Sequence, residues 1–201
     1  QTPEGKLIPG VAERWAIASD GLSWTFKIRK GIKFHDGTDL TGEDVKFTIE
    51  SLLLPDSTAG QVPTLRRMIK NVELRDPYTV VVNNIGVQVE LPNKFAAAGG
   101  CESLVVPKKS IERVGEKEFQ KKPIGSGPWK FSEYKPGASV KYEANVDHWR
   151  YVSDFKYLTI LFVPEEGSRV AMLRAGEVDI ADVTADRVKE LQAAGLRVDD
   201  A

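Results

Sequence analysis

The sequence predicts an α/β or α+β fold with a mixed sheet. Stretches that alternate between apolar and polar residues, as half-buried strands do, are interspersed with stretches of helical period. Some strand-like stretches follow one another as hairpins and others follow a helix, an order that favours a mixed sheet. The 201 residues, of which 41% are hydrophobic and 28% charged, suffice for one ordinary domain or two small ones with a core.

Composition excludes several classes of protein. The formal net charge is −1 with both signs interspersed, so no basic surface for nucleic acid or a membrane is indicated. Apolar runs such as YTVVVNN and LTILFV are strand-sized and too short to span a bilayer. The single cysteine, Cys101, excludes an internal disulfide. The first residues include no initiator methionine and no targeting signal, so we expect a processed or excised piece.

The first predicted element is a hairpin formed by LIPGVAERWAIA and SWTFKIRKGIKF. The second stretch alternates strictly, which places Trp24, Phe26 and Ile28 on one face of a half-buried strand. Asp20-Gly21 precedes it and is a turn dipeptide, because glycine adopts a positive φ without steric cost.

A histidine and several acids follow in KFHDGTDLTGED, a combination that raises the question of a metal or catalytic site. The DG pair is again typical of a turn, and Thr41 with Asp44 fits a helix capping box. A metal site at His35 would need further ligands, and His148 is the only other histidine. We therefore interpret the stretch as the corner between a strand and a helix.

The helix after this corner has one apolar face and ends before Pro55. Its face is formed by Val45, Ile49, Leu52 and Leu53. Next, the pattern predicts a short helix or turn in QVPTLRRM, strands near 72–74 and 79–82 about an Asp-Pro turn, a small-residue loop at 96–100, an apolar segment ending at residue 107, and a short helix.

The rest of the chain begins with GEKEFQKKPIGSGPW, which is predicted to cross between subdomains. A hairpin with Pro136-Gly137 at its turn follows, and YLTILFV is predicted to be a buried strand. GSRVAMLRAGEVDIADV is predicted to form a helix, capped by Gly176, and then a strand. TADRVKELQAAGLRVDD repeats that helix–glycine–strand pattern, with Thr184 or Asp186 as the cap.

Two further motifs carry candidate chemistry. GSGPW (Gly125–Trp129) resembles half of a dinucleotide loop, but a phosphate site needs a helix after the glycines and a strand pattern follows here. We interpret it as a turn that enters a strand. Cys101 could act as a nucleophile only if His35 or His148 approached it in space, and its neighbour Glu102 would raise the thiol pKa.

Three stretches, taken in order, resemble one family. They are GKLIPGVAERWAIASDGLSWTFKIRKGIKFHDGTDLTGEDVKFTIESLL, IGSGPWKFSEYKPGASVKYEANVDHW and LFVPEEGSRVAMLRAGEVDIADV. They resemble the family 5 extracellular solute-binding proteins, which are the peptide-, nickel- and oligosaccharide-binding receptors of bacterial and archaeal ABC importers. The resemblance covers nearly the whole chain. It implies a periplasmic-binding-protein-like fold of class II, cluster C type, in which two lobes joined by a hinge close on the ligand.

By the order of these stretches, the chain resembles lobe I of that fold, incomplete. Residues 1–121 resemble the inserted subdomain, and residues 122–201 resemble the returning segment of the main lobe I sheet, ending near the hinge. Family members are considerably longer, so we expect the N-terminal strand segment and the second lobe to be missing. An apolar sheet edge exposed in this way would favour self-association.

The resemblance implies binding without bond-making and without a cofactor or metal. A small solute, in the first place an oligopeptide, would bridge the lobes and stabilise the closed form, which docks on an ABC permease at the membrane. The protein would be periplasmic or extracellular and would bind no nucleic acid.

The family's first-lobe ligand contacts come from the N-terminal segment and from two loops of the inserted subdomain. Those loops align with TAGQVP and GGCES, whose small residues predict a roomy, neutral wall that suits peptides or sugars better than a metal chelate. Plain turns remain the alternative for both loops. The ligand-binding residues predicted in this way are Thr58, Ala59, Gly60, Gln61, Val62, Pro63, Gly99, Gly100, Cys101, Glu102 and Ser103.

Two other functions remain open at this point. The same lobe could belong to a peptide-responsive sensor that regulates a membrane receptor. The chain could also be a small hydrolase that depends on Cys101 and a histidine, a function that Cys101→Ala would abolish.

Overall fold

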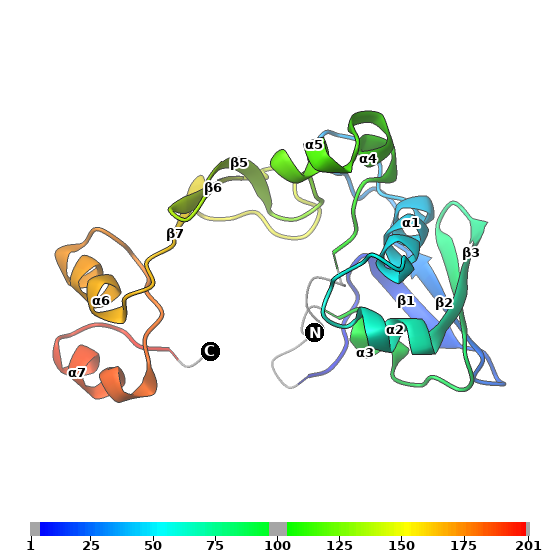
Figure 1. Cartoon of the computed structure of the whole chain (residues 1–201), viewed down its shortest axis with the longest axis horizontal. Coiled ribbons are helices and arrows are strands. Elements are labelled where there is room, and N and C mark those ends of the chain that lie inside the picture. Colours follow the sequence, from blue (N-terminus) through cyan, green and yellow to red (C-terminus); the bar gives the residue numbers. More distant parts are fainter. Residues whose placement is uncertain (1–4, 97–103, 200–201) are drawn as a thin grey trace. The chain divides into compact units, whose positions relative to one another are not determined.

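The computed structural model describes residues 5–96 and 104–199 of the 201-residue chain (Figure 1). By its contacts the chain divides into two units. Unit 1 spans Gln1–Ser132 and Tyr142–Leu158, and unit 2 spans Glu133–Lys141 and Thr159–Ala201. The predicted boundary at residue 121 was drawn from the family resemblance and not from contacts, so it stays a prediction.

Unit 1 contains a four-stranded antiparallel sheet in the order β1-β2-β4-β3. Trp15 pairs with Phe26 across the first two strands, which confirms the predicted hairpin, and Gly21 in its turn has a φ of +72°. The two strands predicted about the Asp-Pro turn are confirmed as well. The strands are β1 (Ala12–Ile17), β2 (Ser23–Ile28), β3 (Ile69–Asp76) and β4 (Thr79–Asn84).

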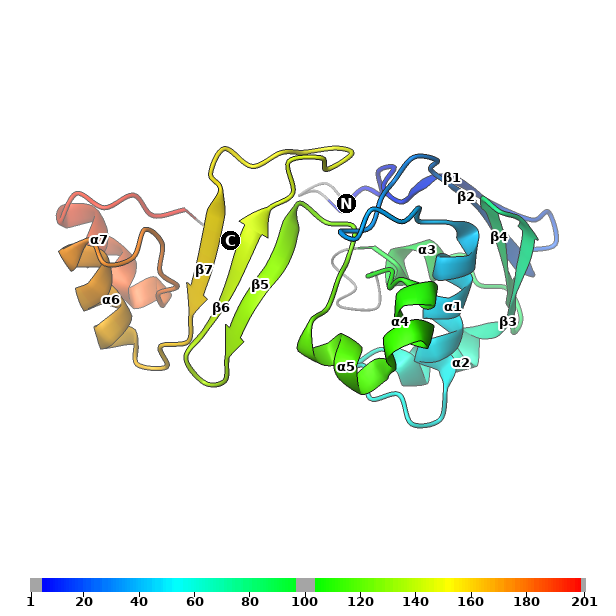
Figure 2. The same ribbon diagram turned by 90° about the horizontal axis from the view of Figure 1, so that it is seen from above.

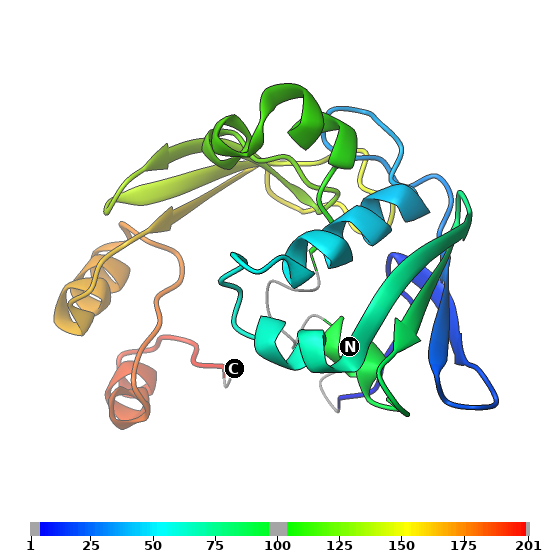
Figure 3. The same ribbon diagram turned by 45° about the vertical axis from the view of Figure 1, so that its right-hand side comes forward.

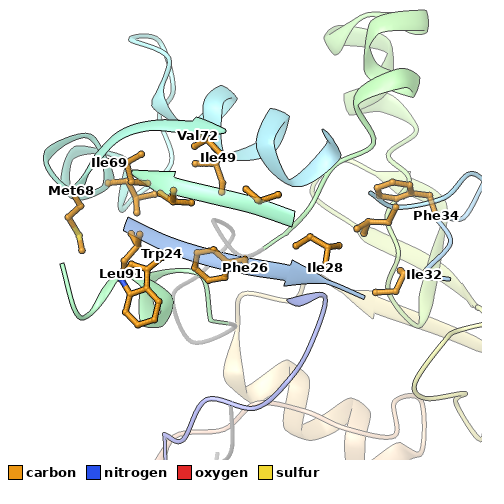
Figure 4. Close-up of a cluster of buried hydrophobic side chains, with 14 residues drawn as sticks. Trp24, Phe26, Ile28, Ile32, Phe34, Ile49, Met68, Ile69, Val72 and Leu91 are labelled. Atoms are coloured by element: carbon orange, nitrogen blue, oxygen red, sulfur yellow. The ribbon is translucent and has the colours of Figure 1, made fainter. Parts of the chain in front are cut away.

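One face of this sheet carries the core. Trp24, Phe26 and Ile28 of β2 are buried, as their alternation predicts. The helices α1 (Gly42–Leu53) and α2 (Val62–Met68) cover this face, and Figure 3 shows α1 beside β3 and β4. Figure 4 shows the resulting cluster, whose buried members are Trp24, Phe26, Ile28, Ile32, Phe34, Leu40, Ile49, Leu65, Met68, Ile69, Val72, Val80, Val82 and Leu91.

The helix α1 begins at the capping box that the sequence predicts. The backbone N–H and the hydroxyl of Thr41 both donate to the Asp44 carboxylate, at 2.9 and 3.0 Å. The other oxygen of that carboxylate accepts the Lys108 N–H at 3.0 Å, and Thr48 accepts the Val106 N–H at 3.0 Å. Two side chains of α1 therefore fix the segment that leads into the next helices.

Three short helices complete the first 121 residues. The helix predicted after residue 107 is α4, and the charged stretch that was interpreted only as a crossing contains a further helix, α5. The helices are α3 (Leu91–Lys94), α4 (Lys108–Val114) and α5 (Glu116–Lys121).

The corner between β2 and α1 is held by Asp36. Its carboxylate accepts the Thr38 N–H at 3.1 Å and the Thr38 hydroxyl at 2.6 Å, while its second oxygen accepts the Ser110 hydroxyl at 2.9 Å. Partial burial acts to raise the pKa of Asp36, but these hydrogen bonds and the charge of Arg113 outweigh it and hold the pKa below its ordinary value. The structural interpretation of this corner is confirmed.

A three-stranded sheet follows in the order β5-β6-β7, comprising β5 (Trp129–Lys135), β6 (Ser139–Ala144) and β7 (Tyr157–Leu161) (Figure 2). The predicted hairpin is confirmed, with Gly137 at a φ of +70° in its turn. The prediction that β7 is buried is wrong, because Tyr157 is 64% and Ile160 44% exposed. Within the described residues β7 is an edge strand that pairs only with β6, and this explains the exposure of its apolar side chains.

Unit 2 also contains α6 (Glu166–Ala175), a 3₁₀ turn (Ala185–Arg187) and α7 (Val188–Ala193). Gly176 caps α6 in the left-handed conformation at a φ of +71°, as predicted. Thr184 occupies the N-cap position of the 3₁₀ turn, but its side chain makes no capping hydrogen bond. The strands predicted after the two helices are wrong: no strand forms within 177–183 or 195–199. Apolar residues there have no neighbouring strand to pair with in the part of the chain that the structure describes.

Polar contacts stabilise the segments around α6 in unit 2. The Arg169 guanidinium donates to the Val163, Pro164 and Asp182 carbonyls at 2.9, 2.6 and 3.0 Å. Glu166 accepts the N–H of Thr184 at 2.6 Å. These contacts fix the segments before and after α6, at residues 163–164 and 182–184, although no strand forms after the helix.

We predict that the core of unit 1 depends on Leu65, which is fully buried in α2. Leu65→Ala should lower the free energy of unfolding by about 2–5 kcal/mol, because it removes apolar contacts and leaves a cavity. Arg67→Ala, at an exposed position of the same helix, should change it by less than about 0.5 kcal/mol. Urea denaturation followed by tryptophan fluorescence measures both, and equal effects would contradict this assignment of the core.

A second prediction concerns acid stability. The folded pKa of Asp36 lies below its ordinary value, so its carboxylate stabilises the fold above the unfolded pKa of 3.8, and that contribution is lost as the pH falls through the lowered folded pKa. Asp36→Asn should therefore lose less stability than the unmodified chain between roughly pH 5 and pH 2. Urea denaturation across this range tests it, with Asp56→Asn as a matched control that keeps the full loss; a parallel loss in Asp36→Asn would contradict the assignment.

Candidate functional site

The candidate site is a hollow of about 770 Å³ that lies wholly within unit 1. Side chains and backbone from β1, β2, α1, the end of α3, the 123–128 segment and the loop after β6 line it. Its volume falls within the range of small-molecule sites, and its lining is mainly apolar, as is common for such sites. The aromatic side chains in the lining include Trp15, Phe26, Phe95, Trp129, Phe131 and Trp149.

The tryptophan of the loop after β6 is held in place by its neighbours. The Arg29 guanidinium lies 5.3 Å from the centre of the Trp149 ring, and the His148 ring lies 5.5 Å from it. Arg150 donates to the Pro9 carbonyl at 3.2 Å. His148 Nδ1 accepts the Tyr151 N–H at 2.9 Å, so this histidine closes a local turn.

The Gly125–Pro128 segment forms another part of the lining and enters β5 directly. No helix follows its glycines, so the interpretation of GSGPW as a turn entering a strand is confirmed. The segment is tied to the β2–α1 corner: Gly125 N–H donates to His35 Nδ1 at 3.1 Å, and His35 Nε2 lies 2.9 Å from the Gly127 carbonyl oxygen. Asn145 supports it from the other side, with its N–H 2.8 Å from the Pro128 carbonyl oxygen.

The contact between these two motifs was not predicted from the sequence. HDG and GSGP were each interpreted as an independent turn, although 90 residues separate His35 from Gly125. The signal in the sequence was a histidine at a turn position where turn geometry alone does not require one. Burial lowers the pKa of His35, and the hydrogen bond to the Gly127 carbonyl offsets this only in part.

The first predicted ligand-binding loop, Thr58–Pro63, does not line the hollow. Thr58, Ala59, Gly60 and Gln61 lead into α2, in which Val62 is fully buried and Pro63 is exposed. Val62 therefore packs into the core, whereas the other five keep some exposure. The second loop, Gly99–Ser103, lies outside the described residues, and so does Cys101 with any role as a nucleophile.

A second hollow, of about 610 Å³, is lined by charged groups. Lys27 reaches it from β2, where its ammonium donates to the Thr79 hydroxyl at 2.6 Å and lies 3.8 Å from the Asp76 carboxylate. Lys30 lies over the Tyr78 ring at 5.3 Å. Since these cations already have partners, the apolar hollow is the better candidate.

Neither a metal site nor a membrane span emerges from the described residues. In residues 5–96 and 104–199, no group of three or more His, Cys, Asp or Glu side chains could hold a metal ion. In the same ranges, no helix is long and apolar enough to cross a bilayer.

Comparison with known proteins gives the same picture from sequence and from structure. The oligopeptide-binding protein AppA of Bacillus subtilis is 35% identical over 185 residues, which cover 89% of this chain and 33% of AppA. The structure of AppA in complex with a nonapeptide superposes with a TM-score of 0.80 at 33% identity, covering 91% of this chain and 36% of that one. Di/tripeptide-binding protein 2 of Pseudomonas aeruginosa is 31% identical over 192 residues, 87% of this chain and 36% of the relative.

The chain thus spans about a third of the length of these relatives. Its fold is that of a periplasmic binding protein, of which it forms part of one lobe. A family model described as bacterial extracellular solute-binding proteins, family 5 Middle, matches residues 6–199. Proteins of this family bind solutes outside the cytoplasm and are not enzymes. The chain belongs to the family 5 extracellular solute-binding proteins.

Proposed function

We propose that this chain forms part of one lobe of the substrate-binding component of an ABC importer, which captures oligopeptides and delivers them to a membrane permease. The family match over residues 6–199 carries the proposal, and two relatives named as peptide-binding proteins support the solute class. Within it, residues 1–121 form the inserted subdomain and residues 122–201 the returning part of the main sheet. The protein works in the periplasm or at the cell exterior.

The proposed mechanism makes and breaks no covalent bond. A solute that contacts both lobes shifts the equilibrium toward the closed form by the difference between its affinities for the two forms. The closed receptor is then the form that the permease accepts. Nothing in this mechanism requires a nucleophile, so the family match favours it over a hydrolase that depends on Cys101.

The apolar hollow suits the side chains of a peptide better than its charged ends. Aromatic residues such as Trp15 and Trp149 offer apolar surface, whereas the termini of a peptide need hydrogen-bonding or charged partners when they are buried. Arg150 at this wall already donates to the Pro9 carbonyl. We therefore propose that this wall selects apolar side chains and that the charged termini are paired elsewhere in the complete protein.

The first functional prediction concerns the 201-residue chain by itself. Isothermal titration with a mixed set of di- to nonapeptides should detect weak binding or none, because burial of a ligand from both sides supplies most of its affinity. The complete protein should bind a member of the set at least a hundredfold more tightly. Tight stoichiometric binding by the 201-residue chain would contradict the two-lobe mechanism.

A variant pair locates the contact surface in the complete protein. If the aromatic hollow contacts the peptide, Trp149→Ala should weaken binding by about tenfold, the usual effect of truncating a central aromatic contact. If the loop before α2 contacts it, Gln61→Ala should show the larger loss instead. Lys70→Ala, at an exposed position of β3, is the control and should leave the affinity unchanged. Circular dichroism checks that each variant is folded, and unchanged affinity in both test variants would exclude both surfaces.

A further inference from the structure

The Gly125–Pro128 segment connects the first 121 residues to β5 and lies outside any strand or helix. Its backbone groups therefore need partners other than a neighbouring strand. His35 supplies three of these contacts: its own N–H donates to the Gly125 carbonyl at 2.8 Å, its Nδ1 accepts the Gly125 N–H at 3.1 Å, and its Nε2 lies 2.9 Å from the Gly127 carbonyl oxygen.

These contacts determine the protonation state of the imidazole. A carbonyl oxygen only accepts hydrogen bonds, so Nε2 must carry a hydrogen to bond the Gly127 carbonyl. A backbone N–H only donates, so Nδ1 must be unprotonated to accept from Gly125. The neutral Nε2–H tautomer alone satisfies both. In the imidazolium ion both nitrogens donate, and Nδ1–H would face the Gly125 N–H.

We propose that His35 is a pH-sensitive latch, which holds the Gly125–Gly127 backbone while its imidazole is neutral and releases it when the imidazole is protonated. The inference does not depend on the proposed function, because its readout is the state of this backbone. The proposed switch lies where the β2–α1 corner contacts the segment that leads into β5. Because the same segment lines the apolar hollow, release also loosens one side of that wall.

The charged groups that act on His35 come from three elements. Lys130 on β5 and His148 in the loop after β6 oppose protonation, whereas Asp36 in its own turn favours it. The Asp36 carboxylate accepts hydrogen bonds from Thr38 and Ser110, and burial of the imidazole outweighs its charge. The net result is a pKa lowered from 6.5, so the latch is closed at neutral pH and opens as the pH falls below that value.

The primary test uses the 201-residue chain without any change at His35. Nitrogen-15 NMR of the two imidazoles should show an unprotonated Nδ1 and a protonated Nε2 for His35 at pH 7.5. The variant His148→Gln leaves one histidine and assigns the signals. On acidification the Gly125 amide should lose protection from hydrogen exchange by about tenfold, after correction for intrinsic rates, with the midpoint of the imidazole titration. An Nδ1–H tautomer, or a Gly125 amide that does not respond to this titration, would overturn the proposal.

Variants separate the latch from a merely structural role. His35→Ala should show the low Gly125 protection at every pH, so that its pH dependence disappears. His35→Asn can still accept from Gly125 through its side-chain oxygen and should keep part of that protection at every pH, acidic pH included. Asn145→Ala removes the other side-chain donor to the Gly127 carbonyl, at 3.3 Å. It should lower the protection of the Gly125 amide without removing the pH response of that protection. A pH response that persists in His35→Ala would also overturn the proposal.

Discussion

The packing of β2 against α1 is the constraint on which the rest of unit 1 depends. Strict alternation along β2 turns Trp24 and Phe26 toward the helices, and Ile49 of α1 meets them in the same cluster (Figure 4). Once α1 is seated in this way, Asp44 at its start holds the Lys108 N–H, and the corner before it carries His35. The position of the apolar hollow therefore depends on one face of the sheet, and the hydrogen bonds around the hollow form only because the hydrophobic contact places α1.

Elements whose determinants are local could be predicted from the sequence. The β1–β2 hairpin, the capping box at Thr41 and the left-handed cap at Gly176 each depend on a few neighbouring residues, and all three are confirmed. The strands predicted after α6 and α7 failed for the opposite reason. A strand is stabilised by its partner, and periodicity such as that around Ile180, which is 87% exposed, carries no information on whether a partner is present. The exposure of β7 has the same cause.

The site shows the same division between local and distant determinants. The HDG turn and the GSGP turn could each be predicted, but the contact of His35 with Gly125 could not, because a side chain that bonds a backbone 90 residues away leaves no periodic pattern. The assignment of the Thr58–Pro63 loop to ligand binding rests on a family resemblance and not on a physical argument. The structure places its Val62 in the core, so that any ligand contact there falls to the exposed neighbours. That assignment stays a prediction.

Several polar side chains at or beside the hollow, among the residues that the structure describes, are engaged by the protein's own backbone. A catalytic site needs a nucleophile or base whose reactive atom faces the substrate. Two polar side chains of the lining contact the protein's own backbone, His148 the Tyr151 N–H and Arg150 the Pro9 carbonyl, and His35 beside the lining bonds the Gly125–Gly127 segment. What remains turned toward the hollow is mainly aromatic and aliphatic surface. Such a surface can stabilise the apolar part of a ligand by burial, which is the property that the proposed receptor requires of its wall.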